Sequence, residues 1–490
     1  MHESIAGDHV GTSGRTEVQS NESEQSVSDP SRRVRSRLLP KRAALGWTGL
    51  WLAVAALVVL PYVHSYRHLS PFDEMVHLDY VVKAQHGHMV NGGEKVGQVA
   101  MRAQACRGSD LKGFKYPRCN QKVLRPAGFP SAGFNTAYPD PPAYYVVTAA
   151  GAAVVGLLPG VNDVVDEARS FGVLWLGAGL ALTFLLALRL GANRWAAAGA
   201  TLIVASNPAV AHAMATVTSD APALLVGGAL CLVTLAVVRR TTSWWWLIPA
   251  SAACTAVKAT GLTVVGLVAL FLLFQLAQVA RRPVDEDEGE AEVESRDESE
   301  PARPMTRREV WLSLAAVVVP AIAVLGAWTV LTGATAFPSA ADIPMRDYFH
   351  VDSIGSDELL GNLLLLTTPL QQGYQPPFMM NVAIGVFMAG VNLLALAGVA
   401  VLAWTGPRGA TRTRLAVATV VAMLVSGTAL VVLIYVGSHT YIAIPSRYGL
   451  PMVPALAACL AVVASQRRVG GWALVGIGLL TTAALLAQTA

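Results

Sequence analysis

Two acidic residues and a histidine stand close together in the segment from residue 70 to residue 80 (SPFDEMVHLDY). His77 follows Asp73 by four residues and Glu74 by three, so in a helix the three side chains occupy neighbouring positions. A carboxylate beside an imidazole can act as a general base with an orienting partner, and such a trio can also hold a divalent metal ion. The spacing therefore makes Asp73, Glu74 and His77 the candidate catalytic residues.

The same segment also has the features of a helix start. Ser70 can cap a helix, and Pro71 suits the first helical position. Asp73, three residues past Ser70, completes a box-like pattern and favours the helix dipole. Capping would account for the acidic residues without any catalysis. The spacing alone fits the two interpretations equally well.

Three charged residues later in the chain interrupt or flank apolar runs. Asp220 follows the sequence ATVTS at the end of one run, where it could serve a site or cap the next helix. Lys258 lies inside an apolar hairpin, so we expect it to pair with a carboxylate, reach a phosphate or extend to the membrane interface. Arg447 stands in a short polar turn, where its guanidinium could bind a phosphate or anchor the chain among lipid headgroups.

The elements that must position these residues are membrane-spanning helices. Of the 490 residues, 53% are hydrophobic and 14% are charged, and runs such as 44–62 and 310–331 carry no charge over a membrane-crossing length. This composition excludes a soluble protein with a large core. The formal net charge of +4 is too small to indicate a nucleic-acid-binding protein. We expect an all-α polytopic membrane protein.

The positions of basic residues predict how the chain is threaded. Six Lys and Arg residues lie between residues 32 and 42 and hold the N-terminus in the cytoplasm. Later arginine pairs end or begin apolar runs and are expected on the same side. If the apolar segment 143–158 crossed the membrane, every later pair would move outside. We therefore predict that this segment is a short helix in or on the outer leaflet.

This threading divides the chain into six parts with about eleven spans. They are a disordered cytoplasmic tail (1–43), a first transmembrane helix (44–63), an outer loop with juxtamembrane helices and the catalytic motif (64–168), a group of transmembrane helices (169–282), an acidic disordered cytoplasmic loop (283–308) and the C-terminal transmembrane helices (309–490) with a second outer loop (333–380). The later spans are expected at 169–188, 195–213, 221–238, 244–257, 262–280, 309–331, 381–404, 415–436, 448–465 and 472–488.

The first outer loop has two chemical features of its own. Residues 64–142 contain ten Lys and Arg but six Asp and Glu, and a basic loop outside the cell suggests an anionic ligand. Cys106 and Cys119 share this polar loop, and their spacing permits a disulfide if the loop faces an oxidising compartment. The other three cysteines lie in apolar runs, where they behave as small hydrophobic residues.

The order of these motifs resembles that of the GT-C superfamily of membrane glycosyltransferases. The matching features are the Asp-Glu pair with a histidine three residues later, the segment PPAYY (141–145), Asp220 and the late segment RYGLP (447–451). They look most like the bacterial relatives of protein mannosyltransferases and aminoarabinose transferases. Asp140 stands where the family often has Lys or His, so no phosphate-binding role is transferred to that position.

The resemblance implies a polyprenyl-phosphate-linked sugar as the donor and an acidic residue, at the position of Asp73, that activates the acceptor. Glu74 is the neighbouring alternative, and His77 could orient either acid or bind the donor phosphate. Substrate binding is then expected at six further residues: Tyr144, Tyr145, Asp220, Lys258, Arg447 and Tyr448. No cofactor is certain, and a divalent metal near the catalytic trio is left open.

The expected function is transfer of a sugar to a glycan, lipid or protein of a bacterial cell envelope, at an active site on the outer face of the plasma membrane. The partners would be the donor, the acceptor and the bilayer, and no nucleic acid. Two other functions fit the same scaffold. One is a transporter or lipid flippase, and the other is a non-catalytic envelope assembly protein in which Asp73 only caps a helix.

Overall fold

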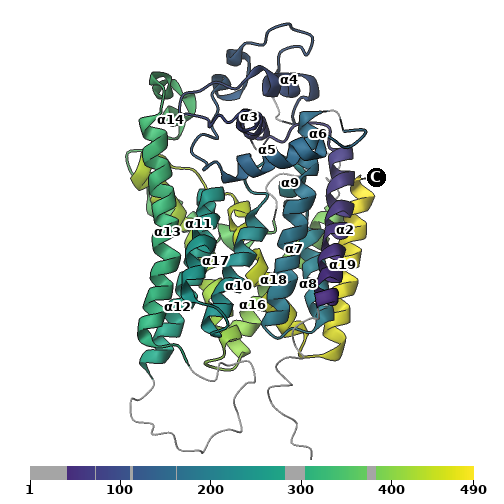
Figure 1. The fold of residues 1–490 in the computed structure, drawn as a ribbon, viewed down its shortest axis with the longest axis vertical. Coiled ribbons are helices and arrows are strands. Elements are labelled where there is room, and N and C mark those ends of the chain that lie inside the picture. Colours follow the sequence, from purple (N-terminus) through teal and green to yellow (C-terminus); the bar gives the residue numbers. More distant parts are fainter. Residues whose placement is uncertain are drawn as a thin grey trace, which may run out of the picture. The chain divides into compact units, whose positions relative to one another are not determined.

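The computed structural model describes residues 41–71, 73–110, 114–161, 163–281, 304–371 and 382–489. Nearly all of the expected N-terminal tail (1–43) and most of the acidic loop (283–308) lie outside the described residues. The chain divides into two compact units, Met1–Gly46 and Trp47–Ala490. The second unit is built from helices and contains every candidate site residue (Figure 1).

Among the residues that the structure describes, eight helical segments are long and apolar enough to cross a membrane. They are Gly46–Ser65 within α2 (Lys41–Ser65), Val164–Arg189 formed by α6 (Val164–Ser170) and α7 (Gly172–Arg189), Ala259–Ala280 containing α12 (Leu262–Ala280), α13 (Arg307–Ala334), α16 (Val382–Thr405), α17 (Thr411–Ser438), Ser446–Ala464 formed by the 3-10 helix η8 (Ser446–Met452) and α18 (Val453–Ala464), and α19 (Arg468–Thr489). The chain is therefore a multi-pass membrane protein.

Three of the expected spans are shorter in the structure than a membrane crossing requires. The segment 195–213 is divided between α8 (Arg194–Ala205) and α9 (Pro208–Ala215), the segment 221–238 forms α10 (Ala223–Val238), and 244–257 forms α11 (Leu247–Val257). The break before α9 has a local cause. Asn207 caps that helix by accepting a hydrogen bond from the Ala209 N–H, and Pro208 takes the first position, where its missing N–H has no consequence.

Short helices gather at one end of the long helices. These are α3 (Glu74–Gln85), α4 (Gln98–Arg107), α5 (Ala143–Val155) and α14 (Pro344–Phe349). The short helix α15 (Ser356–Gly361) packs beside α17, where the Thr428 hydroxyl donates to the Leu359 carbonyl at 2.9 Å. Figure 1 shows α3, α4 and α5 at this end, with α5 lying across the direction of the long helices. At 13 residues, α5 is roughly 20 Å long, shorter than the hydrocarbon core. The expected short helix is therefore present at 143–155, and its direction differs from that of the long helices (Figure 1).

Loops far apart in sequence are joined above this end of the helices. The Phe337 N–H donates to the Gly92 carbonyl at 2.8 Å, and the Ser339 hydroxyl donates to the Gly93 carbonyl at 2.9 Å. Gly93 has a positive φ of 83°, and a Cβ there would lie 2.5 Å from the Ala340 nitrogen. Only glycine fits this close approach, so the loops 64–142 and 333–380 are fastened to one another.

The segment that carries Arg447 is also held by close packing. A Cβ at Gly227 of α10 would lie 1.9 Å from the carbonyl oxygen of Pro451 in η8. The absence of a side chain at Gly227 therefore lets η8 lie directly against α10. This contact fixes the backbone on which Arg447 and Tyr448 stand.

Candidate active site

Asp73 does not cap α3, so the predicted capping arrangement is wrong. The helix begins at Glu74, and Asp73 occupies the N-cap position in a left-handed conformation (φ 59°, ψ 19°) without a side-chain capping bond. Such a conformation costs a residue with a side chain of order 1–3 kcal/mol, less for Asp and Asn, and residues held in it cluster at functional sites. The Asp73 side chain is exposed and lines a pocket that includes Ser70, Tyr116 and Thr136.

The carboxylate of the neighbouring residue Glu74 is buried and is bound by other groups of the protein. It is 1% exposed and forms two bonds with the Arg169 guanidinium, from Nε to Oε1 at 2.8 Å and from Nη2 to Oε2 at 2.7 Å. The backbone N–H groups of Ser70 and Val217 donate to the same carboxylate at 2.6 and 2.8 Å. Burial by itself favours the neutral acid, but Arg169 and these N–H groups outweigh it and lower the pKa of Glu74.

Arg169 also binds the backbone that leads from α2 into α3. Its Nη1 and Nη2 groups donate to the carbonyl oxygens of Tyr66 and His68, each at 2.6 Å. The pair of Glu74 and Arg169 thus connects the start of α3, the end of α6 and the segment after α9. The sequence prediction placed Arg169 only at the start of a span. The cost of burying an unpaired guanidinium there was the signal that could have indicated a partner.

His77 belongs to a chain of hydrogen bonds that reaches the segment before α10. Its Nδ1 lies 2.7 Å from the Tyr145 hydroxyl, which donates to Oδ2 of Asp140 at 3.1 Å. The Ser219 hydroxyl donates to the same carboxylate oxygen at 2.7 Å. Tyr145 is fully buried, and Tyr144 contacts its ring edge-on with centroids 5.0 Å apart. Asp140, to which the sequence assigned no role, is thus the centre of this chain.

Asp220 holds the two candidate phosphate-binding cations. Lys258 donates to Oδ1 at 2.7 Å, and the Nε–H of Arg447 donates to Oδ2 at 3.1 Å. Both cations lie over the ring of Tyr448, at 5.1 and 5.5 Å from its centroid. Burial would raise the pKa of Asp220, but the two cations more than offset burial, so the pKa is lowered. The expected pairing of Lys258 with a carboxylate is confirmed.

These groups form one electrostatic neighbourhood around His77. Besides burial, which lowers its pKa most, the charges that act on His77 are those of Asp140, Lys258, Asp73 and Asp220. The structure therefore brings together residues from α3, the start of α5, the segment before α10 and the turn after α11. The Glu74 carboxylate is not part of this group, because it binds Arg169 and two backbone N–H groups instead.

The structure gives no support for a metal in the catalytic trio. Within the ranges that the structure describes, no three His, Cys, Asp or Glu side chains come together in a way that could hold a metal ion. The reason is local, because Glu74 binds Arg169 instead of joining Asp73 and His77.

A second buried histidine, His212 of α9, was not found from the sequence. Its Nδ1 lies 2.6 Å from the Tyr62 hydroxyl of α2, and its Nε2 lies 2.8 Å from the Ser70 hydroxyl. The side chain is 5% exposed. It therefore joins α2, α9 and the segment just before α3, and it supports the backbone from which Asp73 projects.

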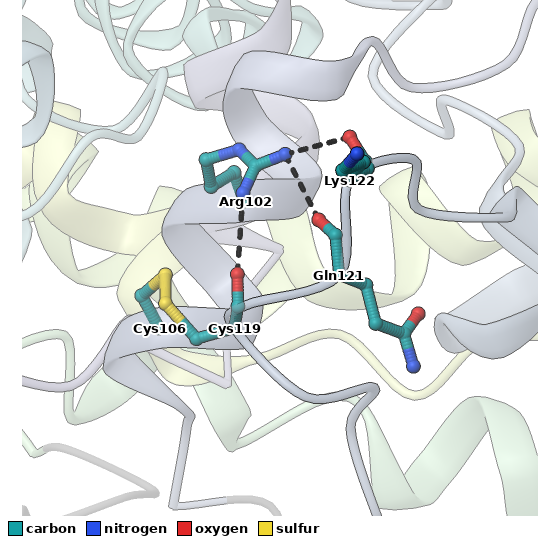
Figure 2. Close-up of a disulfide and its surroundings, with 5 residues drawn as sticks. All are labelled: Arg102, Cys106, Cys119, Gln121 and Lys122. Atoms are coloured by element: carbon teal, nitrogen blue, oxygen red, sulfur yellow. Dashed lines mark hydrogen bonds between the residues drawn. A yellow bond between two sulfur atoms is a disulfide. The ribbon is translucent and has the colours of Figure 1, made fainter.

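Cys106 at the end of α4 and Cys119 are bonded to each other, with their Cα atoms 4.6 Å apart. Figure 2 shows Arg102 of the same helix beside this disulfide, donating to the carbonyl oxygens of Cys119, Gln121 and Lys122 at 3.1 to 3.2 Å. The loop around residue 119 is therefore attached to α4 by one covalent bond and three hydrogen bonds.

No protein-family model matches the sequence, and no curated protein matches it significantly. Solved structures similar to this chain include two of one protein. The crystal structure of ArnT from Cupriavidus metallidurans bound to undecaprenyl phosphate matches with a TM-score of 0.46 and 20% identity, over 89% of this chain and 63% of the ArnT chain. The apo structure of the same protein matches with a TM-score of 0.44 and 19% identity, over 89% and 62%. This chain thus spans less than two thirds of the length of ArnT.

Proposed function

We propose that this chain is a membrane glycosyltransferase that moves a sugar from a polyprenyl-phosphate donor to a hydroxyl group of an envelope acceptor. The observation that carries the proposal is that Asp73 is exposed and does not cap α3. Its carboxylate is exposed, has no capping bond and stands on a left-handed residue one helical turn before His77. An exposed carboxylate that makes no capping bond, close enough to the His77 imidazole for their charges to interact, is suited to accept a proton.

In the proposed reaction, the Asp73 carboxylate takes the proton of the acceptor hydroxyl while the hydroxyl oxygen attacks the anomeric carbon of the donor. The bond from that carbon to the phosphate oxygen breaks, and the polyprenyl phosphate leaves with the electron pair. Direct displacement of this kind inverts the anomeric configuration. Glu74 is poorly suited to be the base, because four donors already occupy its oxygens.

The leaving phosphate gains negative charge, and the cations on Asp220 are placed to stabilise it. Lys258 supplies a compact charge, and the planar guanidinium of Arg447 can grip phosphate oxygens through parallel bonds. Asp220 keeps the two cations together before the donor arrives. We assign the rings of Tyr144, Tyr145 and Tyr448 to the walls around the donor.

We also infer that the site faces away from the cytoplasm in the plasma membrane, with the N-terminus inside. The basic clusters next to the spans support this orientation. The shorter helices would complete about eleven crossings, since α8 with α9, α10 and α11 continue the alternation between the two ends. The bonds of Asp220 with Lys258 and Arg447 support this path by joining the start of α10, the end of α11 and η8.

The test is a transfer assay in washed membranes with radiolabelled polyprenyl-phosphate sugars, including undecaprenyl-phosphate sugars. Asp73→Asn should lower transfer by at least roughly a hundredfold, because it removes the base, while the amount of folded protein stays unchanged. Asp352→Asn, an exposed acid of the second outer loop, is the control and should keep wild-type transfer. Near-normal transfer by Asp73→Asn would contradict the assignment of the base. Lipid flipping by the wild type without any transfer would favour a flippase.

A further inference from the structure

Hydrogen bonds join Ser219, Asp140, Tyr145 and His77 in a chain. Which group donates in each bond follows from the chemistry of the groups. The Asp140 carboxylate can only accept, so Ser219 and Tyr145 both donate to it. The Tyr145 hydroxyl has one hydrogen, and that hydrogen is directed to Asp140. Its oxygen can then only accept from the His77 ring, whose Nδ1 lies 2.7 Å away. Nδ1 of His77 must therefore carry a hydrogen.

The opposite arrangement is disfavoured by the same distances. If Tyr145 donated to Nδ1, its oxygen would face Oδ2 of Asp140 at 3.1 Å with no hydrogen between two acceptors. Turning the tyrosine ring away is also opposed. The ring stacks on Tyr80 with centroids 3.8 Å apart and an interplanar angle of 11°, and on His77 at 5.9 Å and 20°. These contacts hold both rings in a single orientation.

We propose that Asp140 and Tyr145 are positioning residues that fix His77 as the Nδ1–H tautomer, so that its Nε2 accepts a hydrogen bond from the hydroxyl group of the acceptor substrate. The proposal rests on the proposed function and adds a role for His77 within it. A bare Nε2 accepts a hydrogen bond but cannot donate one to a phosphate oxygen. His77 therefore orients the acceptor and does not bind the donor phosphate.

The surroundings of His77 agree with a neutral ring. The charged groups that face it are Asp73 at the N-cap of its own helix, Asp140 before α5, Asp220 before α10 and Lys258 after α11. Burial lowers the pKa of His77 most strongly, and the carboxylates only partly oppose burial. Asp73 stands at the N-cap of α3, and its peptide carbonyl accepts the His77 N–H at 3.1 Å. Its carboxylate is close enough for its charge to act on His77, and we place the acceptor hydroxyl group between this carboxylate and Nε2.

The tautomer can be measured without any substrate. Solid-state NMR of the full chain in bilayers, with ring-¹⁵N histidine, distinguishes protonated from bare Nδ1 and Nε2, and His77→Gln identifies the signals of His77 by their loss. The wild type should show Nδ1 protonated and Nε2 bare near neutral pH. Tyr145→Phe, which removes only the hydroxyl, should produce the Nε2–H form in a substantial share of molecules. Tyr144→Phe, at an equally buried neighbouring tyrosine, should leave the tautomer unchanged.

If Tyr145→Phe does not fold, Asp140→Asn serves the same purpose, because an amide can donate to the tyrosine oxygen and reverse the chain. A wild-type His77 in the Nε2–H form, or an unchanged tautomer in both variants, would overturn the proposal.

The transfer assay gives an independent measurement. Tyr145→Phe should lower kcat at least roughly tenfold and alter the acid limb of the pH profile, whereas a purely structural loss would lower both limbs alike. Failure of the wild type to transfer any sugar refutes the proposed function, while the NMR spectrum still decides the tautomer.

Discussion

Two adjacent carboxylates of identical chemistry have opposite surroundings in this protein. Asp73 is exposed and Glu74 is fully buried, because the chain turns through a left-handed residue between the loop and α3. The buried acid is bound to Arg169 and two backbone N–H groups, so its ionised form stabilises the native state. We therefore expect the two residues to respond differently to the same loss of charge.

Glu74→Gln should destabilise the protein by about 3–5 kcal/mol, because it leaves the Arg169 guanidinium buried without a counter-charge. The free energy of unfolding in detergent, measured with a denaturant and followed by tryptophan fluorescence, tests this. Asp73→Asn is the matched control and should change stability by less than about 0.5 kcal/mol, since asparagine also tolerates a left-handed conformation. Equal stabilities of the two variants would show that the ion pair has no structural role.

The pH dependence of stability follows from the same ion pair. The pKa of Glu74 in the folded protein lies below its ordinary value of 4.5. The contribution of the ionised carboxylate is therefore complete above that ordinary value and is lost as the pH falls through the folded-state pKa. Wild-type stability should decline in this acid range, and Glu74→Gln should lack this part of the decline.

At the residue scale, sequence patterns could predict neighbours along a helix but not partners across the fold. The spacing of Asp73 and His77 placed both at the start of one helix, although Asp73 itself lies just before α3. The cost of an unpaired ammonium left a carboxylate, a phosphate and the membrane interface open for Lys258, and the structure shows the carboxylate of Asp220. Arg169 was missed because its partner Glu74 lies 95 residues away in sequence. Asp140 was set aside because it departs from the family pattern, although the fold places it between Tyr145 and Ser219.

At the element scale, hydrophobicity located the helices but not their lengths. The apolar character of residues 195–213 is continuous in sequence, yet Asn207 and Pro208 divide it into two helices. The short helix at 143–155 could be predicted because the later arginine pairs require one crossing fewer. Capping at Ser70 and Asp73 could not be judged from the sequence. In the structure the Glu74 carboxylate accepts a hydrogen bond from the Ser70 N–H, and the helix begins at Glu74.

The disulfide between Cys106 and Cys119 is expected to stabilise the outer loop and to have little effect on the long helices. Closing a loop with a sequence separation of 13 contributes about 2–3 kcal/mol in the chain-entropy model. Mass spectrometry of unreduced peptides should recover the two cysteines linked. In the double variant Cys106→Ser, Cys119→Ser, hydrogen exchange should increase near residues 98–122. Cys231→Ser, at a buried free cysteine in α10, is the control. Two free thiols in correctly inserted protein would contradict the pairing.

At the scale of the whole molecule, the contacts relate the two outer loops to one end of the long helices. Val351 donates to the His439 carbonyl at 3.0 Å, and Tyr441 donates to the Phe349 carbonyl at 2.9 Å. The loop 333–380, which we propose lies outside, therefore meets the C-terminal end of α17. Arg408 precedes the N-terminal end of that helix, which has 28 residues and is roughly 42 Å long. Residues 352 and 408 thus lie near opposite ends of one helix.

This separation makes the orientation of the protein testable with two single cysteines. In intact cells, a membrane-impermeant maleimide should label Asp352→Cys, because we place the second outer loop outside. Arg408→Cys should be labelled only after the membrane is permeabilised, because the arginines of that turn are expected in the cytoplasm.

The native cysteines provide a low background, since Cys231, Cys254 and Cys459 are buried and the other two are bonded to each other. Arg467→Cys, in the turn between α18 and α19, should behave like Arg408→Cys. Labelling of Arg408→Cys in intact cells, with Asp352→Cys protected, would reverse the orientation and place Asp73 on the cytoplasmic side, where a donor facing the outer leaflet could not reach it.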